Sequence, residues 1–243
     1  MTFKIFAICS FLKSVNIILD EYEKVKDEFE DITRPGHGVV SFGFIHTLGM
    51  EVVPELMADS QRKYPNMQMT LTQSTSSSLL RKLEEGAIDL CLSQKIKSQK
   101  IEVETIELWQ EELFVIVPTT HPLAVREEIR LEEIKDDQFI SIKSGNSLRQ
   151  VVDQFFEQIG VEKNSTFAGE EMHTIAGFVG AGLGVSLIPN IKGLDNYNVK
   201  KLRVTYPECK RSIGVSWAKN RYLSPSATEF KKYLIEYFKG ENE

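Results

Sequence analysis

The chain has 243 residues, an apolar fraction of 42% and a formal net charge of −6. This length suits one large domain or two small ones, and the apolar fraction is sufficient for a hydrophobic core, which excludes wholesale disorder. The acidic balance disfavours a surface that lies mostly on nucleic acid or an anionic membrane, because phosphate contacts need clustered lysine and arginine. A separate nucleic-acid-binding segment remains compatible with this composition.

The N-terminal segment MTFKIFAICSFLKSVNIILD has an apolar run at residues 5–12, which Lys13 interrupts. The run lacks a small-residue cleavage motif and is shorter than the roughly 20 apolar residues that span a bilayer. We therefore expect a soluble protein that is not exported. Cys9, Cys91 and Cys209 are far apart in sequence, so we expect no disulfide framework and no zinc site, as suits the cytoplasm.

Residues 8–32 carry apolar side chains separated by alternating steps of three and four, which is the a/d spacing of a coiled coil. The breaker-rich segment TRPGHG then ends the predicted helix. The pattern fits an amphipathic helix that packs on its own domain or one that pairs with a second chain, and the narrow stripe favours pairing. We assign residues 1–36 to this helix. The predicted dimer contacts are Val15, Ile18, Tyr22, Val25 and Phe29.

From residue 39 onward, predicted strands and helices alternate. Strands or extended segments are expected at residues 39–45, 67–72, 88–92, 102–108, 112–118, 139–142, 166–168, 185–188, 199–204 and 212–217. Helices are expected at residues 50–64, 76–85, 148–159 and 172–181 and from Ser224 onward. The alternation predicts an α/β fold with right-handed βαβ units and a parallel sheet covered on both faces.

The stretch GAGLGVSLIP at residues 180–189 has the alternating glycines of a nucleotide-binding loop. A dinucleotide loop, however, runs from strand through glycines to helix, so that the pyrophosphate meets the N-terminus of a helix. Here the predicted helix comes first. The glycines therefore indicate a helix end and a left-handed turn into a buried strand, and not a phosphate site.

Three predicted junctions between a strand and a helix carry hydroxyl groups: HTLG at residues 46–49, QSTSSS at 73–78 and SGNS at 144–147. In an open parallel sheet, ligands collect at the carboxyl ends of the strands and at helix N-termini. Free backbone N–H groups and hydroxyls suit a small carboxylate. Ordinary N-capping explains each junction equally well, because Ser, Thr and Asn are preferred caps.

Motifs for catalysis are missing from the sequence. There is no Gly-x-Ser-x-Gly, no His-Glu-x-x-His and no Gly-Lys-Ser/Thr phosphate loop, and the four histidines are scattered. His46 and His173 lie beside predicted helix starts, where a role in packing or capping competes with contact to a ligand. We predict that the chain is not an enzyme and binds no cofactor and no metal.

Four segments together resemble the effector-binding region of LysR-type transcriptional regulators. They are RKLEEGAIDLCLS at 81–93, ELFVIVPTTHPLA at 112–124, AGFVGAGLGVSLIP at 176–189 and LSPSATEFKKYL at 223–234. The resemblance runs from about Val39 to the C-terminus, and the helix before it corresponds to the dimerising linker helix of the family. FGFIHTLGMEVVPEL and LTQSTSSSLLRKLEEGAIDLC are most similar to regulators of the glutamate synthase operon.

This resemblance implies a two-lobed fold like that of type 2 periplasmic binding proteins, with the strands that join the lobes crossing near Pro118 and Gly214. Lobe I would comprise residues 37–117 together with 214–243, and lobe II residues 118–213. A small-molecule effector in the interlobe cleft is implied, and glutamate or 2-oxoglutarate is the expected one. The implied contacts are Thr47, Gln73, Ser74, Thr75, Ser144, Gly145, Asn146, Ser147, His173 and Ile188.

The sequence departs from the family in one respect, because only MTFKIFAICSFLKS precedes the region that matches the linker helix. A winged helix-turn-helix has no room there, so DNA is expected to be bound only through a domain that this chain lacks. A truncated product, a degenerate gene and a misassigned start each fit. The rival interpretation is a free-standing solute-binding protein of the same fold, which the heptad helix and the missing export signal disfavour.

Overall fold

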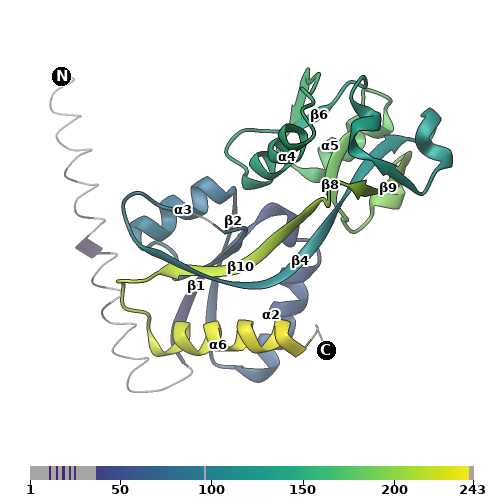
Figure 1. Ribbon diagram of the computed structural model, residues 1–243. Helices are drawn as coiled ribbons and strands as arrows, with labels where there is room; N and C mark the ends of the chain where they lie inside the picture. Colours follow the sequence, from purple (N-terminus) through teal and green to yellow (C-terminus); the bar gives the residue numbers. More distant parts are fainter. Residues whose placement is uncertain are drawn as a thin grey trace, which may run out of the picture.

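The structure is a computed structural model. It describes residues 37–95 and 97–240 and, nearer the N-terminus, the helical residues Phe11, Val15, Ile18, Leu19, Tyr22 and Val25. Two hydrophobic clusters divide the described chain into lobes, which two long strands connect (Figure 1). These strands are β4 (Val103–Pro118) and β10 (Lys210–Ala218). Among the described residues, no helix is long and apolar enough to cross a membrane.

Lobe I packs its helices on a sheet in which β1 lies between β2 and β3 and is parallel to both. Its elements are β1 (Val39–Ile45), η1 (His46–Leu48), α2 (Val52–Lys63), β2 (Gln68–Ser74), α3 (Ser76–Glu85), β3 (Leu90–Ser93) and α6 (Pro225–Gly240). The C-terminal helix α6 packs on β1, where the rings of Phe230 and Phe42 meet edge to face at 5.2 Å.

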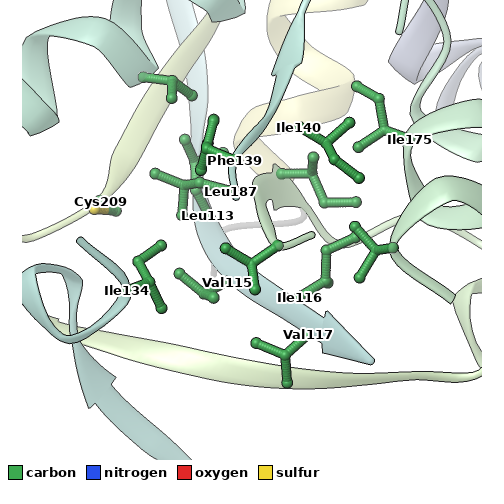
Figure 2. Close-up of a cluster of buried hydrophobic side chains, with 14 of the residues drawn as sticks. Leu113, Val115, Ile116, Val117, Ile134, Phe139, Ile140, Ile175, Leu187 and Cys209 are labelled. Atoms are coloured by element: carbon green, nitrogen blue, oxygen red, sulfur yellow. The ribbon is translucent and has the colours of Figure 1, made fainter. Parts of the chain in front are cut away.

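Lobe II surrounds the second hydrophobic cluster, in which Leu113, Val115 and Ile116 of β4 pack with Phe139 and Ile175 (Figure 2). Its elements are η2 (Pro122–Val125), β5 (Glu128–Arg130), η3 (Leu131–Ile134), β6 (Ile140–Ile142), α4 (Ser147–Gln158), β7 (Phe167–Gly169), α5 (Met172–Gly180), β8 (Ser186–Pro189), η4 (Leu194–Asn196) and β9 (Val199–Tyr206). The strands β6 and β7 form a separate parallel pair.

The predicted α/β, two-lobed fold is confirmed, but the expected parallel sheet is found only in part, because the sheet is mixed. The main sheet has the order β2-β1-β3-β10-β4-β9-β5, and β10 is antiparallel to both β3 and β4. The reason is topological, because the chain enters lobe II along β4 and returns along β10. The extended segments predicted at 102–108 and 112–118 are one continuous strand of 16 residues.

The place where the two strands cross between the lobes follows from their packing. Leu113 and Cys209 already belong to the cluster of lobe II, whereas Ile213 belongs to that of lobe I. We therefore propose that the lobes divide near Glu112 in β4 and near Arg211 in β10, earlier than the expected positions at Pro118 and Gly214. At Gly214 the pairing of β10 with β4 has a β-bulge.

The glycines of GAGLGVSLIP shape a helix-to-strand turn, as predicted. Helix α5 ends at Gly180, Gly182 has a φ of +81°, and β8 follows after Gly184. At Gly184 φ is +153°, and a Cβ atom would lie 2.2 Å from the carbonyl oxygen of Gln138. This position therefore requires glycine to bring the start of β8 against the neighbouring backbone.

Candidate functional site

Loops from both lobes and the strand β4 enclose a small space between the lobes, which we call the cleft cavity. Its volume is about 120 Å³, below the roughly 300–1,000 Å³ of drug-sized ligand pockets, so this conformation suits a ligand of few atoms. The lining residues are His46, Thr47, Leu48, Met50, Glu51, Val52, Gln73, Trp109, Glu111, Glu171, Met172, His173, Asn190, Ile191 and Lys192.

Three of the predicted contact residues line the cleft cavity: Thr47, Gln73 and His173. Thr47 and Gln73 come together because β1 and β2 are parallel neighbours in register, so that Ile45 pairs with Ser74 and both strands end at the same edge. His173 reaches the cavity from the first turn of α5 in lobe II, and its Nδ1 lies 3.2 Å from the hydroxyl of Tyr197. The cavity therefore joins polar groups of both lobes.

A buried ion pair lies at the base of the cleft cavity, where β4 and β10 cross. Arg211 and Glu111 are register partners, and the Nε and Nη2 of Arg211 each lie 2.7 Å from the Glu111 Oε1. Arg211 Nη2 also donates a hydrogen bond of 2.9 Å to the Thr47 Oγ1. Burial lowers the pKa of the Arg211 guanidinium from its ordinary value, and the Glu111 carboxylate opposes that shift.

A second contact closes the cleft cavity from one lobe to the other. His46 Nδ1, at the end of β1, lies 2.7 Å from Glu171 Oε1, at the N-cap of α5. An ionised carboxylate only accepts hydrogen bonds, so Nδ1 carries the proton in this pair. Lys192 and Glu51 also line the cavity, and neither side chain has an ion pair or hydrogen bond to a described residue. These two charges can therefore meet a ligand.

Hydroxyl groups of both lobes meet at a separate space, which we call the serine cavity, of about 510 Å³. Ser147 Oγ lies 2.7 Å from Ser76 Oγ and donates a hydrogen bond of 2.5 Å to Gln94 Oε1. Ser77 Oγ donates to the carbonyl oxygen of Gly145 at 2.9 Å. The lining residues are Ser76, Ser77, Leu80, Gln94, Lys95, Lys97, Gly145, Asn146, Ser147, Gln150, Val151 and Gln154.

The predicted contacts therefore divide into two groups instead of forming one site. Gly145, Asn146 and Ser147 line the serine cavity, and Asn146 Oδ1 also caps α4 by accepting from the backbone N–H of Leu148 at 3.0 Å. The remaining predicted residues line neither of these cavities: Ser74, Thr75, Ser144 and Ile188.

Each of those four residues has a different environment. Thr75 caps α3, since its Oγ1 accepts from the backbone N–H of Ser78. Ser74 is half-buried at the end of β2, and Ser144 is exposed. Ile188 is fully buried in the cluster of lobe II, because β8 is covered on both faces, so its side chain does not face the cleft.

The predicted dimer contacts lie in the N-terminal segment. Val15, Ile18, Tyr22 and Val25 are helical, and Phe29 lies outside the described residues. Ile18, Tyr22 and Val25 are 67%, 65% and 54% exposed, so these apolar side chains are not covered by the described part of the chain.

Sequence reasoning missed the residue that connects the cleft cavity to the crossing strands, Arg211. A signal for it exists in the sequence, because Arg211, Ile213, Val215 and Trp217 alternate along β10 and share one face. A charged residue in phase with three apolar ones points into the protein. Finding its partner Glu111, however, requires the register between β10 and β4.

The described residues contain no cluster of His, Cys, Asp or Glu that could hold a metal ion. Burial raises the pKa of the Cys91 thiol to about 11 and that of the Cys209 thiol to about 12. Both thiols are therefore protonated at neutral pH, and a thiolate is the reactive form of cysteine. The side chains that line the cleft cavity offer hydrogen-bonding groups and charges.

Comparisons with known proteins give a consistent result. Residues 33–239 match the model of the LysR substrate binding domain. An HTH-type transcriptional regulator, YybE of Bacillus subtilis (strain 168), is 48% identical over 228 residues, which cover 94% of this chain and 78% of the relative. The transcriptional dual regulator GltC of the same bacterium is 28% identical over 231 residues, covering 94% of this chain and 77% of GltC.

A solved structure is similar in the same region. The effector binding domain of QuiR in complex with shikimate matches with a TM-score of 0.80 and 30% sequence identity. The match covers 84% of this chain and 98% of that chain. The likeness therefore extends over both lobes and the strands between them.

Proposed function

Because the chain belongs to the LysR family of transcriptional regulators, we propose that its two lobes sense a small carboxylate effector in the cleft cavity. One observation carries this proposal: polar groups of both lobes meet where β4 and β10 pass from one lobe to the other. There Thr47 is hydrogen-bonded to the buried Arg211. A ligand that bonds to both lobes stabilises the closed arrangement by its differential affinity for it. The role proposed is regulatory and cytoplasmic, without catalysis.

The effector class follows from the charges of the cleft cavity. Lys192 has no partner among the described residues, and a carboxylate can pair with it. Glu51 is likewise without a described partner, and an ammonium group can pair with it. Glutamate offers both groups and 2-oxoglutarate only carboxylates, so these two are the first candidates. Shikimate, named with the QuiR structure, is a carboxylate as well and serves as the third.

A thermal-shift screen followed by calorimetry tests the proposal on the full chain. We expect at least one of L-glutamate, 2-oxoglutarate and shikimate to raise the unfolding midpoint with saturation, by about 2.7 kcal/mol in stability at 100 times its Kd. The variant Lys192→Met should lower the affinity for that ligand, whereas Lys95→Met, in the serine cavity, should leave the affinity unchanged. A screen of these and other small carboxylates in which none binds would refute the proposal.

The free-standing solute-binding protein is the alternative of another class. YybE and GltC are both named as transcriptional regulators, and this supports the regulatory role. DNA recognition by the whole regulator would need a segment that reads DNA in addition to the two lobes.

We further propose that the N-terminal helix joins two copies of the chain. The exposure of Ile18, Tyr22 and Val25 at heptad spacing supports this, because apolar seams of that spacing bury themselves against a second helix. In analytical ultracentrifugation we expect Ile18→Glu to shift the chain towards the monomer. Leu19→Glu introduces the same charge in place of an apolar residue that lies beside the seam. This variant should shift the equilibrium towards the monomer less than Ile18→Glu does. A wild-type chain that is monomeric at micromolar concentration would refute the helix pairing.

A further inference from the structure

The ion pair at the strand crossing does more than neutralise two charges. The Arg211 side chain is 1% exposed and that of Glu111 is 22% exposed, so the cation is held inside the protein by a carboxylate at the wall of the cleft cavity. The Nη1 atom of Arg211 has no hydrogen-bond partner among the described residues. An orphaned buried donor costs about 1–3 kcal/mol, so the arrangement is not one that maximises stability.

The bond between Arg211 and Thr47 fixes the direction of the Thr47 hydroxyl. A guanidinium group has five N–H donors and no acceptor, so the Thr47 Oγ1 must accept in this 2.9 Å bond. A hydroxyl carries a single proton, which is then free to donate only away from Arg211. Thr47 is half-buried and lines the cleft cavity, and no described residue accepts that proton.

The positive charge also strengthens this hydroxyl as a donor. Hydrogen bonds in series polarise one another, and the effect is larger inside a protein than in water. A threonine that accepts from a cation therefore donates more strongly to the next acceptor. An anionic oxygen gains most, because bonds to ionised acceptors are the strong ones.

We propose that Arg211 is a positioning residue that holds the Thr47 hydroxyl as an obligatory donor, so that the effector must present an acceptor oxygen to it. This inference rests on the proposed function, namely that the cleft cavity binds the effector. It adds a selection rule, since a ligand group that can only donate is rejected at Thr47. It also joins the ligand to the crossing, because Arg211 pairs with Glu111 between the two strands that connect the lobes.

Calorimetry on full-length variants tests this inference with a double-mutant cycle. The probe is whichever of 2-oxoglutarate, L-glutamate and shikimate binds the wild-type chain. We expect Thr47→Val and Arg211→Met each to weaken binding by about tenfold or more, which is the scale of a hydrogen bond to a charged group. Because both variants break one series of bonds, the double variant should bind little worse than either single variant.

Two further variants separate positioning from general damage. Thr47→Ser keeps the hydroxyl and should restore most of the affinity that Thr47→Val loses. Arg203→Met is the matched control, because Arg203 is an exposed arginine that pairs with Glu112, the neighbour of Glu111 on β4. It should leave ligand affinity unchanged. Circular dichroism melting of every variant establishes that it is folded.

The outcomes are distinct. Effects of Thr47→Val and Arg211→Met that add, or an Arg211→Met variant that binds like the wild type, overturn the positioning role and leave the proposed function standing. A wild-type chain that binds none of the three probes, nor any other small carboxylate, overturns the proposed function and this inference together. The positioning role of Arg211 is supported if the losses of affinity in Thr47→Val and Arg211→Met are not additive and Thr47→Ser restores the affinity.

Discussion

The two cavities between the lobes differ in the way their walls are held together. In the cleft cavity, contacts to carboxylates connect the walls: Arg211 forms an ion pair with Glu111 where the strands pass between the lobes, and His46 contacts Glu171 between the lobes. In the serine cavity the contacts are neutral, between Ser76 and Ser147. The lining of the serine cavity contains Lys95 and Lys97 but no carboxylate among its described residues.

From this difference we propose that the cleft cavity is the one coupled to a movement of the lobes. A charge in a low dielectric responds strongly to a change in its partners, whereas a hydrogen bond between two hydroxyls exchanges readily with water. The proposed ligand of the cleft cavity would bond to residues next to the ion pair of Arg211 and Glu111. We expect the serine contacts, by comparison, to affect how easily the lobes close, whatever the charge of the ligand.

The largest expected effect comes from removing the ion pair between Arg211 and Glu111. Glu111→Ala leaves Arg211 buried without its carboxylate, and we expect the free energy of unfolding to fall by about 3 kcal/mol. Glu112→Ala removes the neighbouring carboxylate, whose partner Arg203 is 61% exposed, and should cost less than about 1 kcal/mol. Urea denaturation measures both. Equal losses would mean that the crossing pair is as well solvated as a surface pair.

A smaller effect sharpens the chemistry of the cleft cavity. Glu51→Gln removes the carboxylate proposed to meet the ammonium group of glutamate, and an exposed pair is worth up to about 1 kcal/mol. We therefore expect glutamate to bind about fivefold more weakly and 2-oxoglutarate to bind unchanged. Glu55→Gln, one turn further along α2 and outside the cavity, is the control for calorimetry. Equal losses of affinity for both ligands would contradict the proposed contact between Glu51 and the ammonium group.

How much of this could be predicted from the sequence depends on which contacts are local. Thr47 and Gln73 are brought to one edge by the parallel pairing of β1 with β2, and alternation of strands and helices predicts such pairing. The glycines after α5 were also predictable, because the order of helix, glycine and strand is a property of adjacent residues.

Contacts between distant segments could not be predicted in this way. The pairing of Arg211 with Glu111 depends on the register of two strands 100 residues apart. The family resemblance implied that Ile188 contacts the effector, but β8 is buried on both faces. In such a strand the alternation of apolar and polar residues no longer shows which face a side chain is on. The junctions at residues 73–78 and 144–147 look alike in sequence, and the sequence does not show that Ser76 and Ser147 meet at a second cavity.

The smallest expected effect comes from removing the neutral hydroxyl contact in the serine cavity. Ser147→Ala removes the hydroxyl that bonds to Ser76 and Gln94, and a neutral hydrogen bond contributes about 0.5–1.5 kcal/mol. Because the closed arrangement is favoured less, every effector of the cleft cavity should bind about threefold more weakly, with the ratio of glutamate to 2-oxoglutarate affinity unchanged. Ser144→Ala alters an exposed serine on the same loop and should change neither affinity in calorimetry. A changed ratio in Ser147→Ala would mean that the serine cavity takes part in recognising the ligand, and the division between a charged site and a neutral closure would then fail.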